Sequence, residues 1–290
     1  MSSAAEIRHI GIAGAGRVGQ ALGRLLQEAG APVRSVASRT PSQAASAAAF
    51  IGPGVQPLSY SELALRASHV LVCVPDSAIE RVAQAMAGFH GVALHTCGAK
   101  GPEALESLRA RGAAVGVMHP LQTVADAASG VSSLRGVAFA VSGDAAAVRW
   151  AGEIAKAAGG RTMHIADGSR PLYHAAAVMA SNYIVALLEA ARELLVAAGI
   201  EPGEALAALG PLARQSLENT LRAGPAAALT GPIERGDAGT IAAHLRALES
   251  VPESTRTLYR AAGMETLDIA RRRGLSAGVA SAIEQLLRDN

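Results

Sequence analysis

Arg8-His-Ile-Gly-Ile-Ala-Gly14-Ala-Gly16-Arg17-Val18-Gly19, followed by apolar side chains at helical spacing up to residue 30, is the stretch that decides the fold. A short β-type run, a GxGxxG turn and a helix are typical of a dinucleotide-binding loop. Gly14 allows the tight turn, Gly16 lets the backbone approach a pyrophosphate, and Gly19 lets the helix pack closely on the sheet. The sequence therefore predicts that residues 14–19, with Arg17 and Val18 among them, bind a dinucleotide.

The rest of the first half alternates β-type runs with helical patterns. We expect strands at 8–13, 33–37, 70–74, 92–94, 114–117, 137–141 and 161–165, with helices at 20–30, 77–87, 102–111 and 144–158. This alternation predicts an α/β fold, a Rossmann-type doubly wound parallel sheet covered on both faces. Strand signals stop after residue 165, and the remainder is predicted to be all-α, with breaks near 199–202, 223–225, 231–239 and 274. The predicted domains are an NADP-binding domain over 1–166 and a helical substrate and dimerisation domain over 167–290.

The end of the second expected strand indicates which dinucleotide binds. An NAD site usually places an acidic side chain there for the ribose 2′-hydroxyl, whereas an NADP site offers arginine and hydroxyl groups. No Asp or Glu occurs between Glu28 and Glu62, and the strand ends in Ser38-Arg39-Thr40. These three side chains can bind a 2′-phosphate by charge-assisted hydrogen bonds, so the predicted cofactor is NADP(H). A solvated surface arginine is the alternative for Arg39.

Composition excludes several classes of protein. The 290 residues are 50% hydrophobic with a formal net charge of +2 and 3% aromatic residues, which argues against disorder and against nucleic acid as a partner. The two cysteines form no disulfide framework or metal cluster, which predicts no metal and a reducing compartment. Residues 1–6 show no export signal, so we expect a cytoplasmic protein. Residues 171–188 carry no charge, but their polar side chains favour a helix facing a wet site over a membrane span.

Catalytic candidates lie where strands end. Val74-Pro75 ends one strand at the edge that ligands use in such sheets, so its backbone is expected beside the nicotinamide ribose. His119 precedes a proline at the end of another strand, and a histidine titrates near neutrality, so it can give a proton to a reduced carbonyl. His174 and Asn182 fall on one face of the helix predicted from residue 169. For all three polar residues, hydrogen bonding within the protein is the structural alternative.

A loop in the helical half is the candidate for substrate binding. Thr230-Gly231-Pro232 offers free amides in a tight turn, with a helix behind it and Arg235 as a charge partner, which would suit a carboxylate. An ordinary capping loop with Asp237 or Thr240 near the cap is the alternative.

Several motifs together resemble a known family. They are the glycine loop, Val74-Pro-Asp, His95-Thr-Cys-Gly, His119-Pro-Leu-Gln-Thr, Tyr173-His-Ala-Ala-Ala with Ala180-Ser-Asn-Tyr, and Thr230-Gly-Pro with Arg235-Gly-Asp. The chain resembles Rossmann-like proteins with a carboxy-terminal helical domain of unknown function, in the 6-phosphogluconate dehydrogenase-like superfamily. Ketopantoate reductase, pyrroline-5-carboxylate reductase and prephenate dehydrogenase are relatives. The resemblance implies hydride transfer between NADP(H) and a small carboxylate-bearing substrate, and a homodimer.

The chain departs from this family at one point. Many relatives carry a catalytic lysine on the first long helix of the second domain, but neither Lys100 nor Lys156 lies there. The resemblance therefore suggests His174 for the proton-donor or carbonyl-orienting role. The expected activity is reduction of a 2-oxo acid, ketopantoate first. The alternatives are a cyclic-imine reductase, a prephenate dehydrogenase-like enzyme and a non-catalytic NADP(H)-binding redox sensor.

Overall fold

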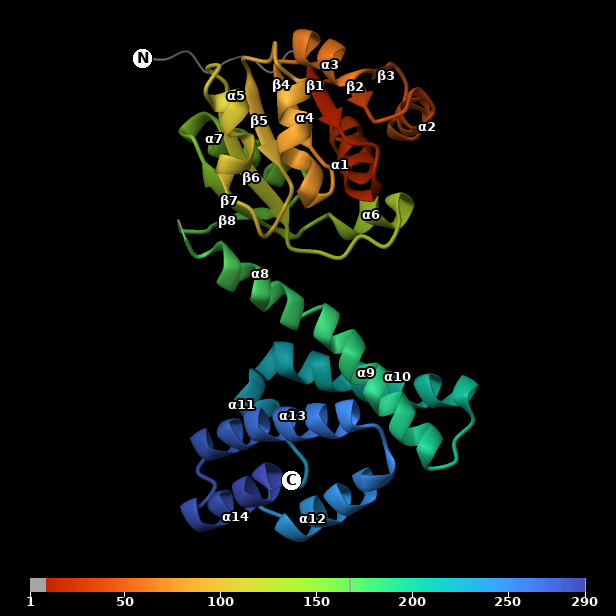
Figure 1. Cartoon of the computed structure of the whole chain (residues 1–290), viewed down its shortest axis with the longest axis vertical. Coiled ribbons are helices and arrows are strands. Elements are labelled where there is room, and N and C mark those ends of the chain that lie inside the picture. Colours follow the sequence, from red (N-terminus) through yellow and green to blue (C-terminus); the bar gives the residue numbers. More distant parts are fainter. Residues whose placement is uncertain (1–8, 167, 290) are drawn as a thin grey trace. The chain divides into compact units, whose positions relative to one another are not determined.

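The chain forms two compact units, Met1–Met179 and Ala180–Asn290 (Figure 1). The computed structural model describes residues 9–166 and 168–289, so residues 1–6, on which the expectation about export rests, lie outside it. The division falls after the helix Arg170–Met179, 13 residues beyond the predicted boundary at 166. This helix therefore belongs to the same unit as the sheet.

The first unit is built on one eight-stranded sheet, which confirms the predicted fold class. The strand order is β3-β2-β1-β4-β5-β6-β7-β8. The strands are β1 (Ile10–Ala13), β2 (Val33–Ala37), β3 (Gln56–Leu58), β4 (His69–Val72), β5 (Val92–His95), β6 (Ala114–Pro120), β7 (Ala138–Gly143) and β8 (Arg161–His164). The expectation of an all-parallel sheet is wrong at one pair, because β7 runs antiparallel to β6. A buried apolar run has the same pattern in either direction, so periodicity did not reveal the reversal.

Helices cover both faces of this sheet. They are α1 (Arg17–Glu28), α2 (Pro41–Ile51), α3 (Tyr60–Arg66), α4 (Ile79–Ala85), α5 (Glu106–Arg109), α6 (Ala127–Ser133) and α7 (Ala145–Ala157), with short 3-10 turns η1 (Asp76–Ala78) and η2 (Pro102–Leu105). Helix α8 (Arg170–Met179) follows β8 and leads away from the sheet (Figure 1). One core contains Leu22, Ile51 and Trp150 from α1, α2 and α7, and the other contains Leu63, Val82 and Leu108 from α3, α4 and α5. Two separate cores on one sheet are what a doubly wound fold requires.

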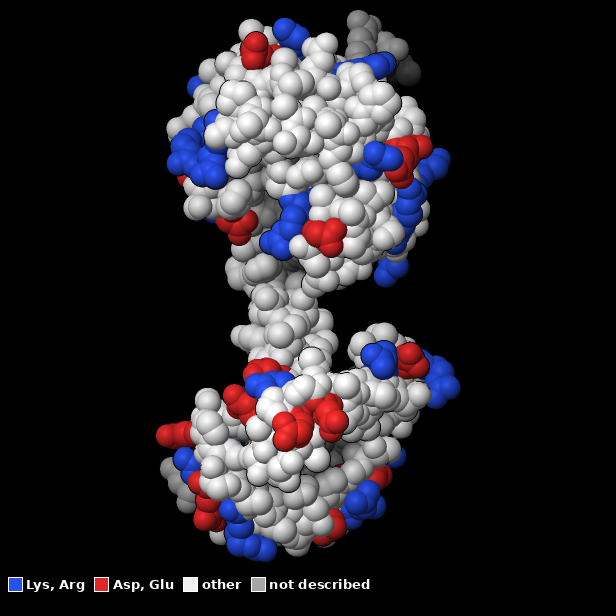
Figure 2. Space-filling model, turned by 90° about the vertical axis from the view of Figure 1, so that its right-hand side faces the viewer, with Lys and Arg blue, Asp and Glu red and all other residues white. Residues whose placement is uncertain are grey.

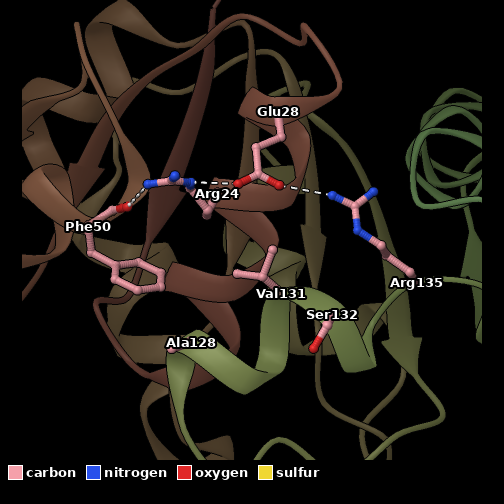
Figure 3. A pocket seen from close by; sticks show the side chains of 7 residues that line it. All are labelled: Arg24, Glu28, Phe50, Ala128, Val131, Ser132 and Arg135. Carbon is pink, nitrogen blue, oxygen red and sulfur yellow. Dashed lines mark hydrogen bonds and ion pairs between the residues drawn. The ribbon is translucent and has the colours of Figure 1, made fainter.

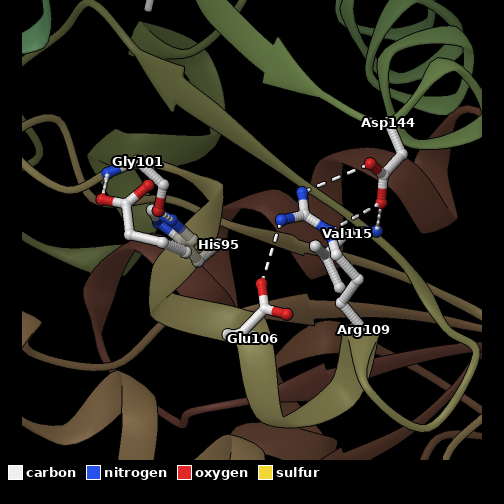
Figure 4. A network of polar contacts seen from close by, with 7 residues as sticks. His95, Gly101, Glu106, Arg109, Val115 and Asp144 are labelled. Carbon is white, nitrogen blue, oxygen red and sulfur yellow. Dashed lines mark hydrogen bonds and ion pairs between the residues drawn. The ribbon is translucent and has the colours of Figure 1, made fainter. Parts of the chain in front are cut away.

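Polar contacts fix the turns at the edge of this sheet. Asp144, which follows β7, accepts a hydrogen bond from the backbone N–H of Val115 at 2.8 Å and pairs with Arg109 at 3.2 Å (Figure 4). Arg109 also pairs with Glu106, 3.0 Å away. These contacts join α5, the start of β6 and the start of α7, at the edge of the sheet opposite the carboxyl end of β6.

The second unit is helical, as predicted. Its helices are α9 (Asn182–Ala197), α10 (Pro202–Ala223), α11 (Pro225–Ala228), α12 (Ala238–Ala247), α13 (Glu253–Arg272) and α14 (Ala277–Arg288), with a 3-10 turn η3 (Leu248–Ser250). The predicted breaks at 199–202, 223–225, 231–239 and 274 all separate helices. A small core forms between α12, α13 and α14, around Ile241, Leu267 and Ile283.

The expected long helix from residue 169 is interrupted. Helix α8 ends at Met179 and α9 begins at Asn182, with Ser181 in a non-helical conformation (φ −131°, ψ −76°). His174 and Asn182 therefore do not share one regular helix face, which corrects that expectation. Serine and asparagine favour helix ends because their side chains compete for backbone hydrogen bonds. By length and composition alone, the stretch Arg170–Ala197 could cross a membrane, a property that core helices of soluble proteins share.

Candidate functional site

A pocket of about 740 Å³ opens at the carboxyl ends of β1, β2 and β4 in the first unit. This is the edge of a doubly wound sheet where ligands bind. Of the predicted cofactor residues, Gly14, Gly16, Ser38, Arg39, Val74 and Pro75 line the pocket. The pocket is not lined by the other four predicted residues, Arg17, Val18, Gly19 and Thr40. These four therefore do not border the pocket directly.

The three loop glycines differ in what surrounds them. A Cβ on Gly14 would lie 2.2 Å from the carbonyl oxygen of Cys73, and its φ is +123°. A Cβ on Gly19 would lie 2.2 Å from the carbonyl oxygen of Gly14. At Gly16 the nearest such atom is 3.9 Å away, so the backbone there borders open space. Gly14 and Gly19 are thus needed for packing, whereas Gly16 leaves room for a ligand to approach.

The start of α1 suits an anion. Gly16 provides no side-chain cap, and the first turn of the helix contains no acidic residue. The free N–H groups and the positive end of the helix dipole are a common pyrophosphate site. Arg17, at the first position of the helix, donates to the carbonyl oxygen of Ala125 at 3.0 Å. The residues present therefore fit a dinucleotide.

Two arginines from different elements line the same pocket. Arg39 lines it as predicted, and Arg81 of α4 lines it too, a residue that sequence analysis missed. The positive charges of both arginines act on the phenol of Tyr60, which also lines the pocket. Thr40 instead caps α2, because its hydroxyl accepts from the backbone N–H of Gln43 at 3.3 Å. A 2′-phosphate would thus meet Arg39 and Arg81, while the hydroxyl of Thr40 already caps α2.

A histidine cluster lies at the same edge of the sheet. His119 is on β6, and its Nδ1 lies 2.6 Å from the hydroxyl oxygen of Tyr173 on α8. The ring centroids of His119 and His174 are 6.3 Å apart, nearly perpendicular. Burial, helped by the charges of His174 and Arg170, lowers the pKa of His119 to about 4. His119 is therefore neutral at pH 7, so it can act as a hydrogen-bond donor but not as an imidazolium.

Gly98 faces both histidines. A Cβ at this position would lie 2.8 Å from Nδ1 of His174 and 3.0 Å from Nε2 of His119. Nδ1 of His174 is buried and has no hydrogen-bond partner among the described residues. The two ring nitrogens therefore converge on Gly98 and occupy the room that a side chain there would need.

His95 is a structural member of this region. It is fully buried at the end of β5, where its Nδ1 accepts from the backbone N–H of Cys97 at 3.2 Å. Its Nε2 therefore carries the proton and donates to the carbonyl oxygen of Gly101 at 2.9 Å (Figure 4). Burial lowers the pKa of His95 to about 4. Both ring nitrogens are used, so His95 holds the turn at 96–101, which includes Gly98.

The remaining predicted residues lie in the second unit. Asn182 is the first residue of α9. Thr230 and Pro232 line a separate, mostly apolar pocket of about 290 Å³ within that unit. Gly231 has a φ of +103°, and Arg235 is exposed. Asp237 caps α12, accepting from the backbone N–H of Thr240 at 2.9 Å, as the capping alternative anticipated. The start of α12 is therefore occupied by a carboxylate of the chain itself, which leaves Thr230 as the remaining donor for a substrate.

A third hollow, of about 400 Å³, lies beside α1 and α6 (Figure 3). Its two arginines, Arg24 and Arg135, both pair with Glu28, at 2.8 and 2.9 Å. The lining keeps one net positive charge, but both guanidinium groups are already paired with the same carboxylate, so this hollow is a poor candidate for a charged ligand.

Two family models match the chain. Residues 9–94 match the family described as NADP oxidoreductase, coenzyme F420-dependent, and residues 137–266 match the domain of unknown function DUF2520. The chain is thus similar to an NADP oxidoreductase domain over residues 9–94, and its similarity to DUF2520 starts at β7 and includes Tyr173 and His174. This confirms the predicted class, an NADP-dependent oxidoreductase, its cofactor NADP(H), and the resemblance to Rossmann-like proteins with a helical domain of unknown function.

Solved structures share the fold at low sequence identity. Protein TM1727 of Thermotoga maritima is 22% identical, with a TM-score of 0.73 over 91% of this chain and 99% of that one. Protein BF3122 of Bacteroides fragilis is 24% identical, with a TM-score of 0.72 over 93% and 100%. The Plasmodium falciparum pyrroline carboxylate reductase with NADP bound is 13% identical, with a TM-score of 0.57 over 98% and 97%. No curated protein matches the sequence significantly.

Proposed function

We propose that the protein reduces the carbonyl group of a small 2-oxo acid with NADPH, and that ketopantoate, reduced to pantoate, is the first substrate to test. The observation that supports this most directly is the pair of histidine rings, His119 and His174, whose nitrogens converge beside Gly98. They lie at the edge of the sheet that also holds the cofactor pocket. A carbonyl oxygen needs such donors as negative charge develops on it.

Different residues of the chain are proposed to bind the cofactor, donate the proton and bind the substrate. Gly14 and Gly16 with the start of α1 would hold the pyrophosphate, and Arg39 with Arg81 the 2′-phosphate. Bound NADPH supplies a hydride. In the first unit, His119 or His174 contacts the carbonyl oxygen and gives it a proton. In the second unit, Asn182 is the residue proposed to orient the substrate, and Thr230 and Arg235 are those proposed to bind its carboxylate. Of the two lysines, Lys100 lies in the turn that contains Gly98, but its ammonium group pairs with Glu80 at 2.7 Å, and Lys156 lies on α7.

A substrate panel tests the class. NADPH consumption is measured with 2-oxo acids, with cyclic imines of the pyrroline-5-carboxylate type and, in the reverse direction, with prephenate. Coenzyme F420 is included because the matching family description names it. Turnover of a 2-oxo acid supports the proposal, and turnover of an imine or of prephenate replaces it. Tight NADPH binding without any turnover would favour a non-catalytic NADP(H)-binding redox sensor.

Four variants then separate the roles on the substrate found. His119→Asn and His174→Asn test the proton donor, whose loss should lower kcat by about 10² to 10⁴ with NADPH affinity nearly unchanged. Asn182→Ala tests whether the side chain of Asn182 orients the substrate. Thr230→Ala should act mainly through KM, because a carboxylate donor contributes to binding in both ground and transition states. If neither histidine variant lowers kcat by more than a few-fold, the assignment of the donor is wrong.

We further propose that the second unit forms a homodimer through α9 and α10. Large apolar side chains are exposed on both helices, among them Val185, Leu187, Leu212, Leu217 and Leu221. The stretch 171–188 is free of charge, and Figure 2 shows it as an uncharged segment. Beyond it, α9 carries an ion pair between Glu189 and Arg192, and α10 carries Arg214, Glu218 and Arg222. Apolar stripes beside charged side chains suit a second protein copy better than lipid. Light scattering tests this, and a monomer at micromolar concentration contradicts it.

The compartment proposed for this enzyme is the cytoplasm. Both cysteines, Cys73 and Cys97, are buried free thiols, as expected in a reducing environment.

A further inference from the structure

We propose that Tyr173 sets the tautomer of His119 and supplies, through the ring of His119, the proton that the reduced carbonyl oxygen takes up. This deepens the proposed function and rests on it. Tyr173 acts through another residue, so it is a positioning residue as well as the source of the proton. The contact that carries the proposal is the 2.6 Å distance between the hydroxyl oxygen of Tyr173 and Nδ1 of His119, with the two rings edge to face.

The direction of this hydrogen bond follows from the chemistry of the two groups. A phenol is a stronger acid than a neutral imidazole N–H, and an imidazole nitrogen is a stronger base than a phenol oxygen. The hydroxyl of Tyr173 therefore donates and Nδ1 of His119 accepts. Burial raises the pKa of Tyr173 to about 12 and lowers that of His119 to about 4, so both are neutral at pH 7. The single proton of the His119 ring must then sit on Nε2.

Nε2 of His119 lies beside Gly98, since a Cβ there would be 3.0 Å from it, and it has no hydrogen-bond partner in the described part of the chain. An oxygen atom that reaches this nitrogen would accept a hydrogen bond from Nε2–H. This is the contact proposed for the carbonyl oxygen of the substrate.

Two proton transfers through His119 would deliver the proton from Tyr173 to the substrate oxygen. Once the carbonyl carbon has received hydride, its oxygen is an alkoxide, which takes the Nε2 proton as the N–H bond breaks and the O–H bond forms. Nδ1 takes the hydroxyl proton of Tyr173, so the ring stays neutral and a phenolate remains. The positive charge of Arg170 lowers the pKa of Tyr173, which favours this phenolate. Water then returns the proton to Tyr173, which is only half buried.

The first test is spectroscopic and needs no substrate. Nitrogen-15 NMR of the histidine rings in the full-length protein reports which nitrogen is protonated, and His119→Gln assigns the signals. We expect His119 to carry its proton on Nε2 alone in the wild type and to become a mixture of tautomers in Tyr173→Phe. Tyr259→Phe is the matched control, because the hydroxyl of Tyr259 lies 2.8 Å from Nδ1 of His244, so it should change His244 and leave His119 unaffected. A proton on Nδ1 in the wild type, or no change in Tyr173→Phe, overturns the proposal.

The second test is kinetic, with ketopantoate or the substrate that the panel identifies. Tyr173→Phe should lower kcat about 100-fold, with unchanged affinity for NADPH by calorimetry. Wild-type kcat should stay flat from about pH 6 to 9, whereas an imidazolium donor would lose tenfold per pH unit above its pKa. The groups whose charges act on His119 are His174 and Arg170 on α8, His95 on β5 and Asp76 on η1.

Gly98→Ala completes the test. Its backbone is outside the left-handed region, but the added methyl group would lie 2.8 Å from Nδ1 of His174 and 3.0 Å from Nε2 of His119, so it must displace the rings. We expect turnover to be lost while the affinity for NADPH is kept. An active wild type with full activity in Tyr173→Phe or Gly98→Ala refutes the proton path alone. A wild type with the expected tautomer but no turnover on any substrate refutes the proposed function.

Discussion

The two units of the chain differ in how they treat their apolar side chains. The first unit packs leucine, isoleucine and valine into two cores, one on each face of the sheet. The second unit has one small core between α12, α13 and α14, and it leaves leucines of α10 exposed. The first unit is thus stabilised by its own sheet. The second leaves apolar side chains of α9 and α10 exposed, and four experiments test or sharpen this difference.

The largest effect is expected in the glycine loop of the first unit. Gly14→Ala forces a side chain into a conformation with φ +123° and against the carbonyl oxygen of Cys73, and should cost about 3 kcal/mol or more of unfolding free energy. Gly16→Ala is the matched control, since its φ is −78° and its Cβ has room. It should keep the stability and weaken NADPH binding. Denaturant unfolding and calorimetry measure both, and equal stability losses would contradict the distinction.

Acid should weaken the first unit in particular. The pKa of buried His95 is lowered to about 4, so the unfolded chain takes up a proton below its ordinary value of 6.5 while the folded unit does not. The stability is complete above pH 6.5 and is lost as the pH falls from 6.5 to 4, by about 3 kcal/mol for His95 alone. The lowered pKa of His119 likewise makes the folded unit less stable as the pH falls.

The only tryptophan, Trp150, is buried in the first unit, so its fluorescence follows that unit during unfolding. Hydrogen exchange of backbone amides in α13 and α14 follows the unfolding of the second unit. His95→Gln should flatten the pH dependence seen by Trp150, because the amide keeps a donor for Gly101 but does not titrate. A pH dependence that is unchanged in this variant would contradict the assignment.

A pair of equally exposed leucines tests whether a partner covers the second unit. Leu221 on α10 and Leu65 on α3 are both 77% exposed. Leu221→Glu should weaken a homodimer by about 2 kcal/mol, whereas Leu65→Glu in the first unit should not change the mass measured by light scattering. If both variants dimerise like the wild type, α10 is not in the interface.

The smallest effect concerns the cofactor. Arg39→Ala should remove most of the preference for NADPH over NADH, about 1 to 3 kcal/mol for a charge-assisted contact, and Arg81→Ala part of it. Calorimetric titration with both cofactors gives the difference directly. Equal affinity of the wild type for NADPH and NADH would remove the role assigned to both arginines.

Sequence predicted the first unit better than the site. Most strands were found because they are buried apolar runs, but β3 was missed, since Gln56-Pro57-Leu58 is short and partly exposed at the edge of the sheet. The interruption at residues 180–181 was hidden among alanines, which favour helix at any position. Tyr173 was quoted within a motif without a role. Its partner His119 is 54 residues away in sequence, a contact that only the fold creates.

The place where the chain divides into units has a consequence for how such proteins diversify. Because α8 ends before the division at residue 180, Tyr173 and His174 belong to the same body as Gly98, His119 and the cofactor pocket. Under the proposed function, substitutions in residues 180–290 would alter which substrate is accepted and leave unchanged the groups that handle hydride and proton. A fusion after Met179 that exchanges the second unit tests this separation of recognition from chemistry.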